Sequence, residues 1–95
     1  MSRAFVKDDA GGPDPRVRYP LPEPGDPGFE EAVARALLRG ANEGDSAGAE
    51  EATGYLWGDP RLAAIMARLR DEAMAREDDR METLANRYLR AAQRS

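Results

Sequence analysis

Prolines are confined almost entirely to one part of this 95-residue chain. Six of the seven lie between Pro13 and Pro27, and the seventh is Pro60. Each proline fixes its own φ, lacks an amide donor and disfavours the α region for the residue before it, so neither a helix nor a central strand is expected in this stretch. The sequence therefore predicts a proline-rich arm, extended or disordered, over residues 1–26, followed by a helical domain over residues 27–95.

The predicted arm has one apolar edge. Val17, Tyr19 and Leu21 alternate with Arg18 and Pro20. Alternate side chains of an extended chain point to the same side. Two interpretations follow: a disordered tail, or an arm that docks this edge on an apolar groove.

After residue 26 the apolar residues recur at the spacing of an α-helix. Asp26-Pro27 is a cap followed by proline at the first helical position, and Gly40 with the polar residues 42–45 predicts where this first helix ends. A second, shorter helix is expected to begin at Asp45 or Ser46 and to run to about Trp57. The apolar stripes are Phe29, Val33, Ala36 and Leu37 in the first helix and Ala49, Ala52 and Leu56 in the second.

Gly58-Asp59-Pro60 predicts the start of a third helix, because it joins a terminating glycine, a capping aspartate and a proline at the first position. The polar run 76–80 predicts a break, with Asp79 and Glu82 as a capping box and a fourth helix from Arg80; one continuous helix is the alternative. The stripes are Leu62, Ile65, Met66, Leu69 and Ala73, then Met81, Leu84, Ala85, Tyr88, Leu89 and Ala92. We therefore expect an all-α fold, a small bundle of three to four short helices arranged as hairpins, either alone or as a homodimer.

Residues 52–56 and 85–89 share Ala, Tyr and Leu at a separation near the period of tetratricopeptide repeats. Two copies are fewer than such a solenoid needs, and chance similarity between alanine-rich helices is the stronger explanation.

The chemistry of the chain is limited by two absences. It has no histidine and no cysteine, which removes the commonest general base, the commonest transition-metal ligand and the thiolate nucleophile. Acidic clusters at residues 43–51 and 77–79 have the oxygen ligands that Mg²⁺ prefers, but helix caps and a solvated surface are the ordinary explanation for them. We therefore expect no enzymatic activity, no cofactor and no metal site.

The charge balance argues against direct binding of nucleic acid. The chain has 18 acidic against 14 basic residues and a net charge of −4, which argues against attachment to nucleic acid through phosphates. All but one of the basic residues are arginines, and interleaved acids predict a salt-bridged surface. No apolar run is long enough to span a membrane, and residues 1–9 lack the apolar core of a signal peptide, so a cytoplasmic location is expected.

Two stretches resemble the Gre family of bacterial transcript-cleavage factors. One is the opening Met1-Ser2-Arg3-Ala4-Phe5-Val6-Lys7-Asp8-Asp9; the other is Gly44-Asp45, followed by Tyr55-Leu56-Trp57-Gly58-Asp59-Pro60-Arg61-Leu62 and Ile65. The resemblance implies a helical hairpin that enters the secondary channel of RNA polymerase, with two acids at its tip. Asp45 matches the first of these acids and Glu51 stands where the second would be. Because six residues separate the two here instead of three, we expect binding and not RNA cleavage.

The sequence thus predicts a small non-enzymatic protein-interaction factor, with bacterial RNA polymerase as its expected partner. Alternatively, the chain is a tetratricopeptide-like or dimeric helical module unrelated to transcription, with Tyr55 and Trp57 as interface anchors. The candidate partner-binding residues are Asp45, Glu51, Tyr55, Trp57 and Arg61.

Overall fold

Helices make up the regular structure of residues 14–94, the part of the chain that the computed structural model describes. No strand occurs within this range, so the predicted all-α fold is confirmed. The opening segment Met1–Asp9 of the Gre resemblance lies outside the described residues. The elements are α2 (Pro15–Arg18), α3 (Phe29–Glu43), α4 (Ser46–Thr53), the 3₁₀ helix η1 (Pro60–Leu62), α5 (Ala63–Ala75) and α6 (Asp79–Gln93).

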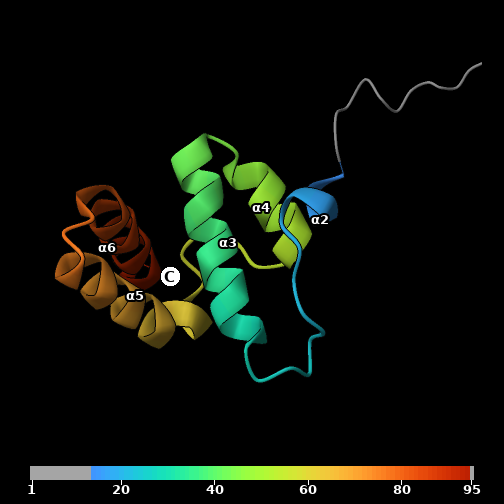
Figure 1. The fold of residues 1–95 in the computed structure, drawn as a ribbon, viewed down its shortest axis with the longest axis horizontal. Coiled ribbons are helices and arrows are strands. Elements are labelled where there is room, and N and C mark those ends of the chain that lie inside the picture. Colours follow the sequence, from blue (N-terminus) through green and yellow to red (C-terminus); the bar gives the residue numbers. More distant parts are fainter. Residues whose placement is uncertain (1–13, 95) are drawn as a thin grey trace, which may run out of the picture.

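The helices form two hairpins around α3 (Figure 1). α4 folds back on α3 with α2 beside it, while α5 and α6 pack against each other on the other side of α3. The core between them is aliphatic, with two buried tyrosines, Tyr19 and Tyr88. Its largest fully buried side chains besides the tyrosines are Leu37, Leu62, Met66, Leu84 and Val33.

The first predicted helix is correct in place, but it begins later than predicted and Gly40 has a different role. Asp26 orders the turn before α3, since its carboxylate accepts a hydrogen bond from the Gly28 amide at 2.8 Å, and the helix begins at Phe29. Gly40 does not end the helix but lies buried inside it, where a Cβ would stand 2.6 Å from the Cβ of Ala49. Glycine at this position therefore allows α3 and α4 to approach closely. The helix ends at Gly44, within the predicted cluster 42–45, and the φ of Gly44, 74°, is left-handed.

The second helix is shorter than predicted. α4 ends at Thr53 because Gly54 adopts a left-handed conformation with φ of 78°, and residues 54–59 form turns instead of a further helical turn. The prediction that Leu56 belongs to the buried stripe is therefore wrong, and this side chain is 69% exposed.

The predicted break between the last two helices is confirmed. α5 ends at Ala75, Glu77 has a left-handed φ of 59°, and α6 begins at Asp79. The cap, however, is Asp78, whose side chain accepts a hydrogen bond from the Met81 amide at 3.2 Å. The predicted cap at Asp79 and start at Arg80 are each one residue too late.

The expectation that no helix forms between Pro13 and Pro27 is wrong. Pro15 begins the single turn α2, where a missing amide costs nothing, and the Asp14 carboxylate caps it by accepting from the Arg16 amide at 2.8 Å. Tyr19 is 2% exposed and Leu21 packs partly buried against the core, so these two residues of the predicted apolar edge dock on the domain. Val17, the third, is 73% exposed.

The internal similarity of residues 52–56 and 85–89 does not correspond to equivalent structure. Tyr55 lies in the turn after α4, whereas Tyr88 lies in the second half of α6. Across residues 14–94, none of the helices combines the length and apolar character needed to cross a bilayer.

Candidate interaction surface on the 54–61 loop

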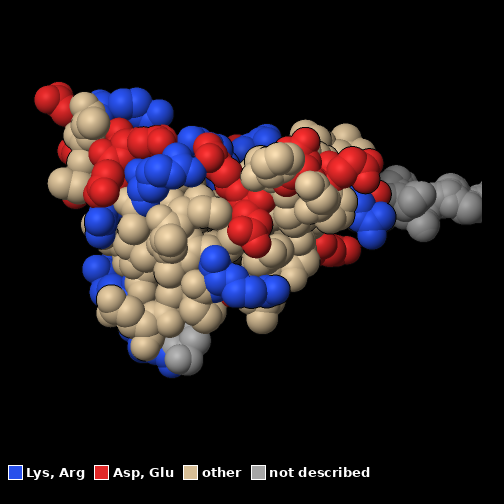
Figure 2. All heavy atoms as spheres, turned by 90° about the horizontal axis from the view of Figure 1, so that it is seen from below, with Lys and Arg blue, Asp and Glu red and all other residues tan. Residues whose placement is uncertain are grey.

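Residues 54–61, called here the 54–61 loop, run from the end of α4 into η1 and carry the most exposed large apolar side chain of residues 27–94, Leu56. An open hollow of about 410 Å³ lies on the loop, lined by Gly54, Leu56, Trp57, Gly58, Asp59, Pro60 and Arg61. η1 lies on the lower side of the molecule in Figure 1, which Figure 2 views from below. Figure 2 shows on that face a broad area of uncharged residues bordered by basic groups in the lower half of the view, and most acidic groups in the upper half.

Side chains from α4 fix the first half of the loop. The Thr53 hydroxyl accepts a hydrogen bond from the Tyr55 amide at 3.2 Å, and the Glu50 carboxylate accepts one from the Trp57 amide at 2.8 Å. The Leu56 carbonyl accepts from the Asp59 amide at 3.1 Å, which closes a turn with Leu56 at its start. Hydrogen bonds thus hold the backbone on both sides of Leu56, while its side chain is exposed.

α6 fixes the second half. Gly58 is buried with φ of 90°, and a Cβ there would stand 2.8 Å from the Cβ of Ala91, so only glycine allows the loop to lie this close to α6. The fully buried Tyr88 donates its hydroxyl to the Asp59 carbonyl at 2.8 Å. Burial raises the pKa of Tyr88 to about 12, because ionisation would leave a phenolate away from water.

The aromatic residues of the loop have different roles. Trp57 packs edge-on against the Tyr88 ring, with centroids 5.0 Å apart and an interplanar angle of 72°, and so anchors the loop on the core. The Tyr55 ring is half-buried, and the Arg61 guanidinium lies 4.5 Å from its centroid. The Asp59 carboxylate accepts from the same guanidinium at 2.7 Å and from the Arg61 amide at 2.9 Å. These hydrogen bonds hold the pKa of Asp59 below its usual value.

The structure brings together three of the five sequence-predicted site residues. Tyr55, Trp57 and Arg61 all lie on the 54–61 loop. Glu51 is exposed on α4, and Asp45 faces α2, where it accepts a hydrogen bond from the Tyr19 hydroxyl at 2.8 Å. Among residues 14–94, no hydrogen bond, ion pair or ring contact joins these two acids to the other three.

Sequence reasoning missed the exposure of Leu56 and the support that Glu50 and Tyr88 give to the loop backbone. Glu50 does lie on a helix, α4, but its hydrogen bond with the Trp57 amide was not foreseen. Leu56 was placed on a helix expected to reach Trp57. The signal that could have corrected this is Gly54, because a glycine after a helix of eight residues is a common C-terminal cap. Nothing in the sequence indicates that the Tyr88 hydroxyl supports the Asp59 backbone, since the two residues are 29 positions apart.

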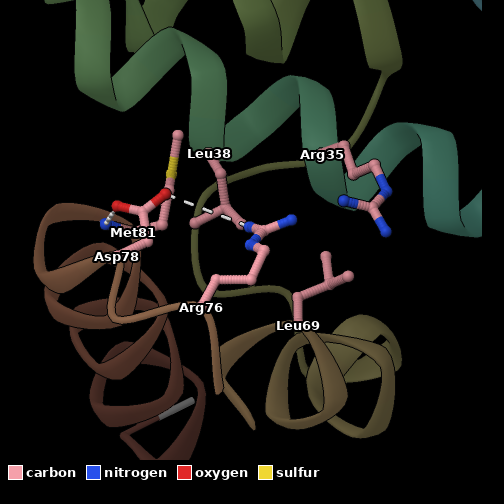
Figure 3. A pocket seen from close by; sticks show the side chains of 6 residues that line it. All are labelled: Arg35, Leu38, Leu69, Arg76, Asp78 and Met81. Carbon is pink, nitrogen blue, oxygen red and sulfur yellow. Dashed lines mark hydrogen bonds and ion pairs between the residues drawn. The ribbon is translucent and has the colours of Figure 1, made fainter. Parts of the chain in front are cut away.

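A second hollow, of about 190 Å³, lies between α3, α5 and α6 (Figure 3). Leu38, Leu69 and Met81 form its apolar part, and charged side chains stand around them. Each of those charges has another role: Asp78 caps α6, Arg76 stands 3.9 Å from Asp78, and Arg35 donates to Glu31 at 2.8 Å. We therefore assign no function to this hollow.

Within the described range 14–94, no three acidic side chains converge closely enough to hold a metal ion. Comparisons with protein-family models, with curated proteins and with solved structures find no match to this chain. The fold and the surface therefore define the chain as a small all-α protein that presents one rigid apolar loop. The Gre resemblance remains a prediction carried by the motif residues themselves.

Proposed function

We propose that this chain is a small, non-enzymatic, cytoplasmic protein-interaction factor that docks on its partner through the 54–61 loop. The observation that carries the proposal is Leu56, which is 69% exposed at the tip of a loop whose backbone is bonded to α4 and whose base is packed on α6.

A rigid apolar tip favours binding for an entropic reason. Association loses less conformational freedom when the contacting segment is already ordered, so more of the apolar burial appears as affinity. Trp, Tyr and Arg are enriched among residues that dominate interface energy, and Tyr55, Trp57 and Arg61 flank Leu56. Burying the Leu56 side chain fully would contribute up to roughly 2 kcal/mol.

The Gre resemblance supports RNA polymerase as the partner to test first. One of the stretches that carry it, from Tyr55 to Leu62, consists of residues of the 54–61 loop and the end of η1. In this proposal Leu56 and Arg61 contact the polymerase, with Glu51 as an exposed acid nearby in sequence. Asp45 is the weaker candidate, because it is hydrogen-bonded to Tyr19 within the chain.

A dimeric helical module is the alternative function. Its support is the exposure of two further large apolar side chains, Val17 at 73% and Met74 at 52%, which a second copy could cover. This alternative predicts self-association and no affinity for the polymerase.

The test is a pull-down of purified bacterial RNA polymerase by the immobilised wild-type chain, by Leu56→Asp and by Met74→Asp. Met74 is the matched control, since it is also an exposed apolar side chain but lies near the end of α5. We expect wild type and Met74→Asp to retain the polymerase and Leu56→Asp to lose at least nine-tenths of it. Equal retention by all three would refute the loop as the docking surface, and retention by none would refute the polymerase as the partner. Sedimentation of the same three proteins then decides between monomer and dimer.

A further inference from the structure

The segment 14–21, called here the strap, is held on the α3–α4 hairpin by contacts typical of a bound peptide. Tyr19 is buried, with only 2% of the residue exposed, and its hydroxyl donates a hydrogen bond to the Asp45 carboxylate at 2.8 Å. Asp45 stands at the connection between α3 and α4. The hairpin therefore offers both a seat for the ring and an acceptor for the hydroxyl.

Charged contacts surround this seat. The Arg18 guanidinium donates to Glu43 at 3.0 Å and stands 3.6 Å from Asp45. Arg39 donates to the Arg18 carbonyl at 2.9 Å, while its guanidinium lies 5.2 Å from the centroid of the Tyr19 ring. The hairpin thus recognises an arginine followed by a tyrosine through two acids, one base and a hydrophobic seat.

The strap is joined to α3 by a segment with few ties to the rest of the fold. Within the described residues, the hydrogen bonds of residues 22–28 are local, from Asp26 to Glu23, from Gly28 to Asp26 and to the first turn of α3. Seven residues reach roughly 23 Å when extended, and the prolines at 22, 24 and 27 favour extended conformations. An open hollow of about 290 Å³ lies at the surface where the strap meets α3, lined by Tyr19 and Pro20 and by Ala32 and Ala36 among others.

We propose that this surface of the α3–α4 hairpin is a binding site for an arginine–tyrosine peptide segment. The chain's own strap occupies it in cis, and the strap of a second copy is its ligand in trans. The second copy is the occupant that the structure favours, because it carries the Arg18-Tyr19 pair whose fit is seen here. The inference does not depend on the 54–61 loop.

The strap of the same chain blocks the site from straps of other chains. A short linker gives an effective concentration on the order of millimolar, so at micromolar protein the strap of the same chain outcompetes any strap in trans. At micromolar concentration we therefore expect this site to cause no dimerisation of the wild-type chain. Exchange becomes measurable when the cis strap is disabled.

The first experiment measures fluorescence anisotropy of a labelled peptide of residues 14–22 with full-length chains. We expect saturable binding to Tyr19→Ala, whose strap no longer fills the seat, and at least tenfold weaker binding to wild type. Binding to the double variant Tyr19→Ala/Asp45→Ala should also weaken at least tenfold. A peptide with alanine in place of the tyrosine is the matched control and should not bind.

The second experiment tests exchange between chains. Tyr19→Ala retains the binding site but lacks the tyrosine of the ligand, whereas Asp45→Ala retains the ligand but lacks the acceptor in the site. An equimolar mixture should therefore form a heterodimer that native mass spectrometry detects. Neither variant should form a dimer by itself. Far-UV circular dichroism must show wild-type helicity for both. If Tyr19→Ala has lost helicity, Tyr19→Phe replaces it, because it removes only the hydroxyl bond to Asp45 and should bind the peptide severalfold more tightly than wild type. The proposal would be overturned if a variant with wild-type helicity bound the peptide no more tightly than wild type.

Discussion

Replacing Tyr88 by phenylalanine should give a stability difference that changes with pH in a defined direction. The Tyr88 ring is fully buried and its hydroxyl donates to the Asp59 carbonyl at 2.8 Å, so at pH 8 loss of this hydrogen bond should lower the free energy of unfolding by about 1 kcal/mol. Phenylalanine keeps the ring contact with Trp57. The effect at pH 8 is therefore that of the hydroxyl alone.

At higher pH the difference should shrink and then reverse. The pKa of Tyr88 is about 12 in the folded chain and about 10 in the unfolded chain, so folding favours its protonated form. This contribution is complete below pH 10 and is lost as the pH rises from 10 to 12; at pH 11 the loss from wild type is about 1.4 kcal/mol. Phenylalanine cannot ionise, so Tyr88→Phe should equal or slightly exceed wild type in stability at pH 11.

Urea unfolding followed by Trp57 fluorescence at pH 8 and pH 11 measures this difference directly, because Trp57 lies 5.0 Å from the ring at position 88. The other tyrosines are present in both proteins, and their ionisation cancels in the comparison. A stability difference that stays constant between pH 8 and pH 11 would show that Tyr88 is not held in a buried, protonated state, and the account of how the loop is supported would fail.

Two further predictions concern the glycines and the charged surface. Gly54→Ala should lower the free energy of unfolding by about 1–2 kcal/mol, the cost of a left-handed alanine with free space around its Cβ. Gly58→Ala should lower it further, because its Cβ would also stand 2.8 Å from the Cβ of Ala91 on α6. Equal urea midpoints for the two variants would contradict the close packing of loop and helix. Arg68 donates to Glu31 at 2.6 Å and to Glu72 at 2.9 Å. Hydrogen bonds from Arg35 and then from Arg68 hold the pKa of Glu31 below its ordinary value. Arg68→Gln should therefore raise the pKa of Glu31 in an NMR titration, and 1 M salt should reduce the difference between the two proteins; an unchanged titration would show that this ion pair between α3 and α5 does not form in solution.

Helix identity in this chain could be read from local signals. Three local features were enough to place the helices after residue 26 and the break between the last two. They are the apolar stripe with Val33 and Leu37, the capping pair Asp59-Pro60, and the polar run before Arg80. These signals act within one or two turns, through hydrogen bonds between near neighbours and through the spacing of apolar side chains along one helix. Three of the candidate site residues, Tyr55, Trp57 and Arg61, lie on one loop because they are close in sequence.

The main errors in the helical domain arise from packing between segments and, at Leu56, from an overlooked glycine cap at position 54. Gly40 was expected to end a helix, but the approach of Ala49 makes it a packing position. Leu56 was expected in the core, but Gly54 turns the chain before a further helical turn can form, and bonds from Glu50 and Tyr88 hold the backbone that exposes it.

What the sequence by itself determined is the helices after residue 26, since their periodicity and caps are properties of neighbouring residues. What only the tertiary structure decided is which apolar side chains those helices leave exposed and which segments cover the rest. Tyr19 illustrates the division: its place in a proline-rich arm is evident from the sequence, but its burial depends on Asp45, 26 residues away, to accept its hydroxyl. A buried polar group is stable only when such an acceptor is present, and folding is what brings the two together.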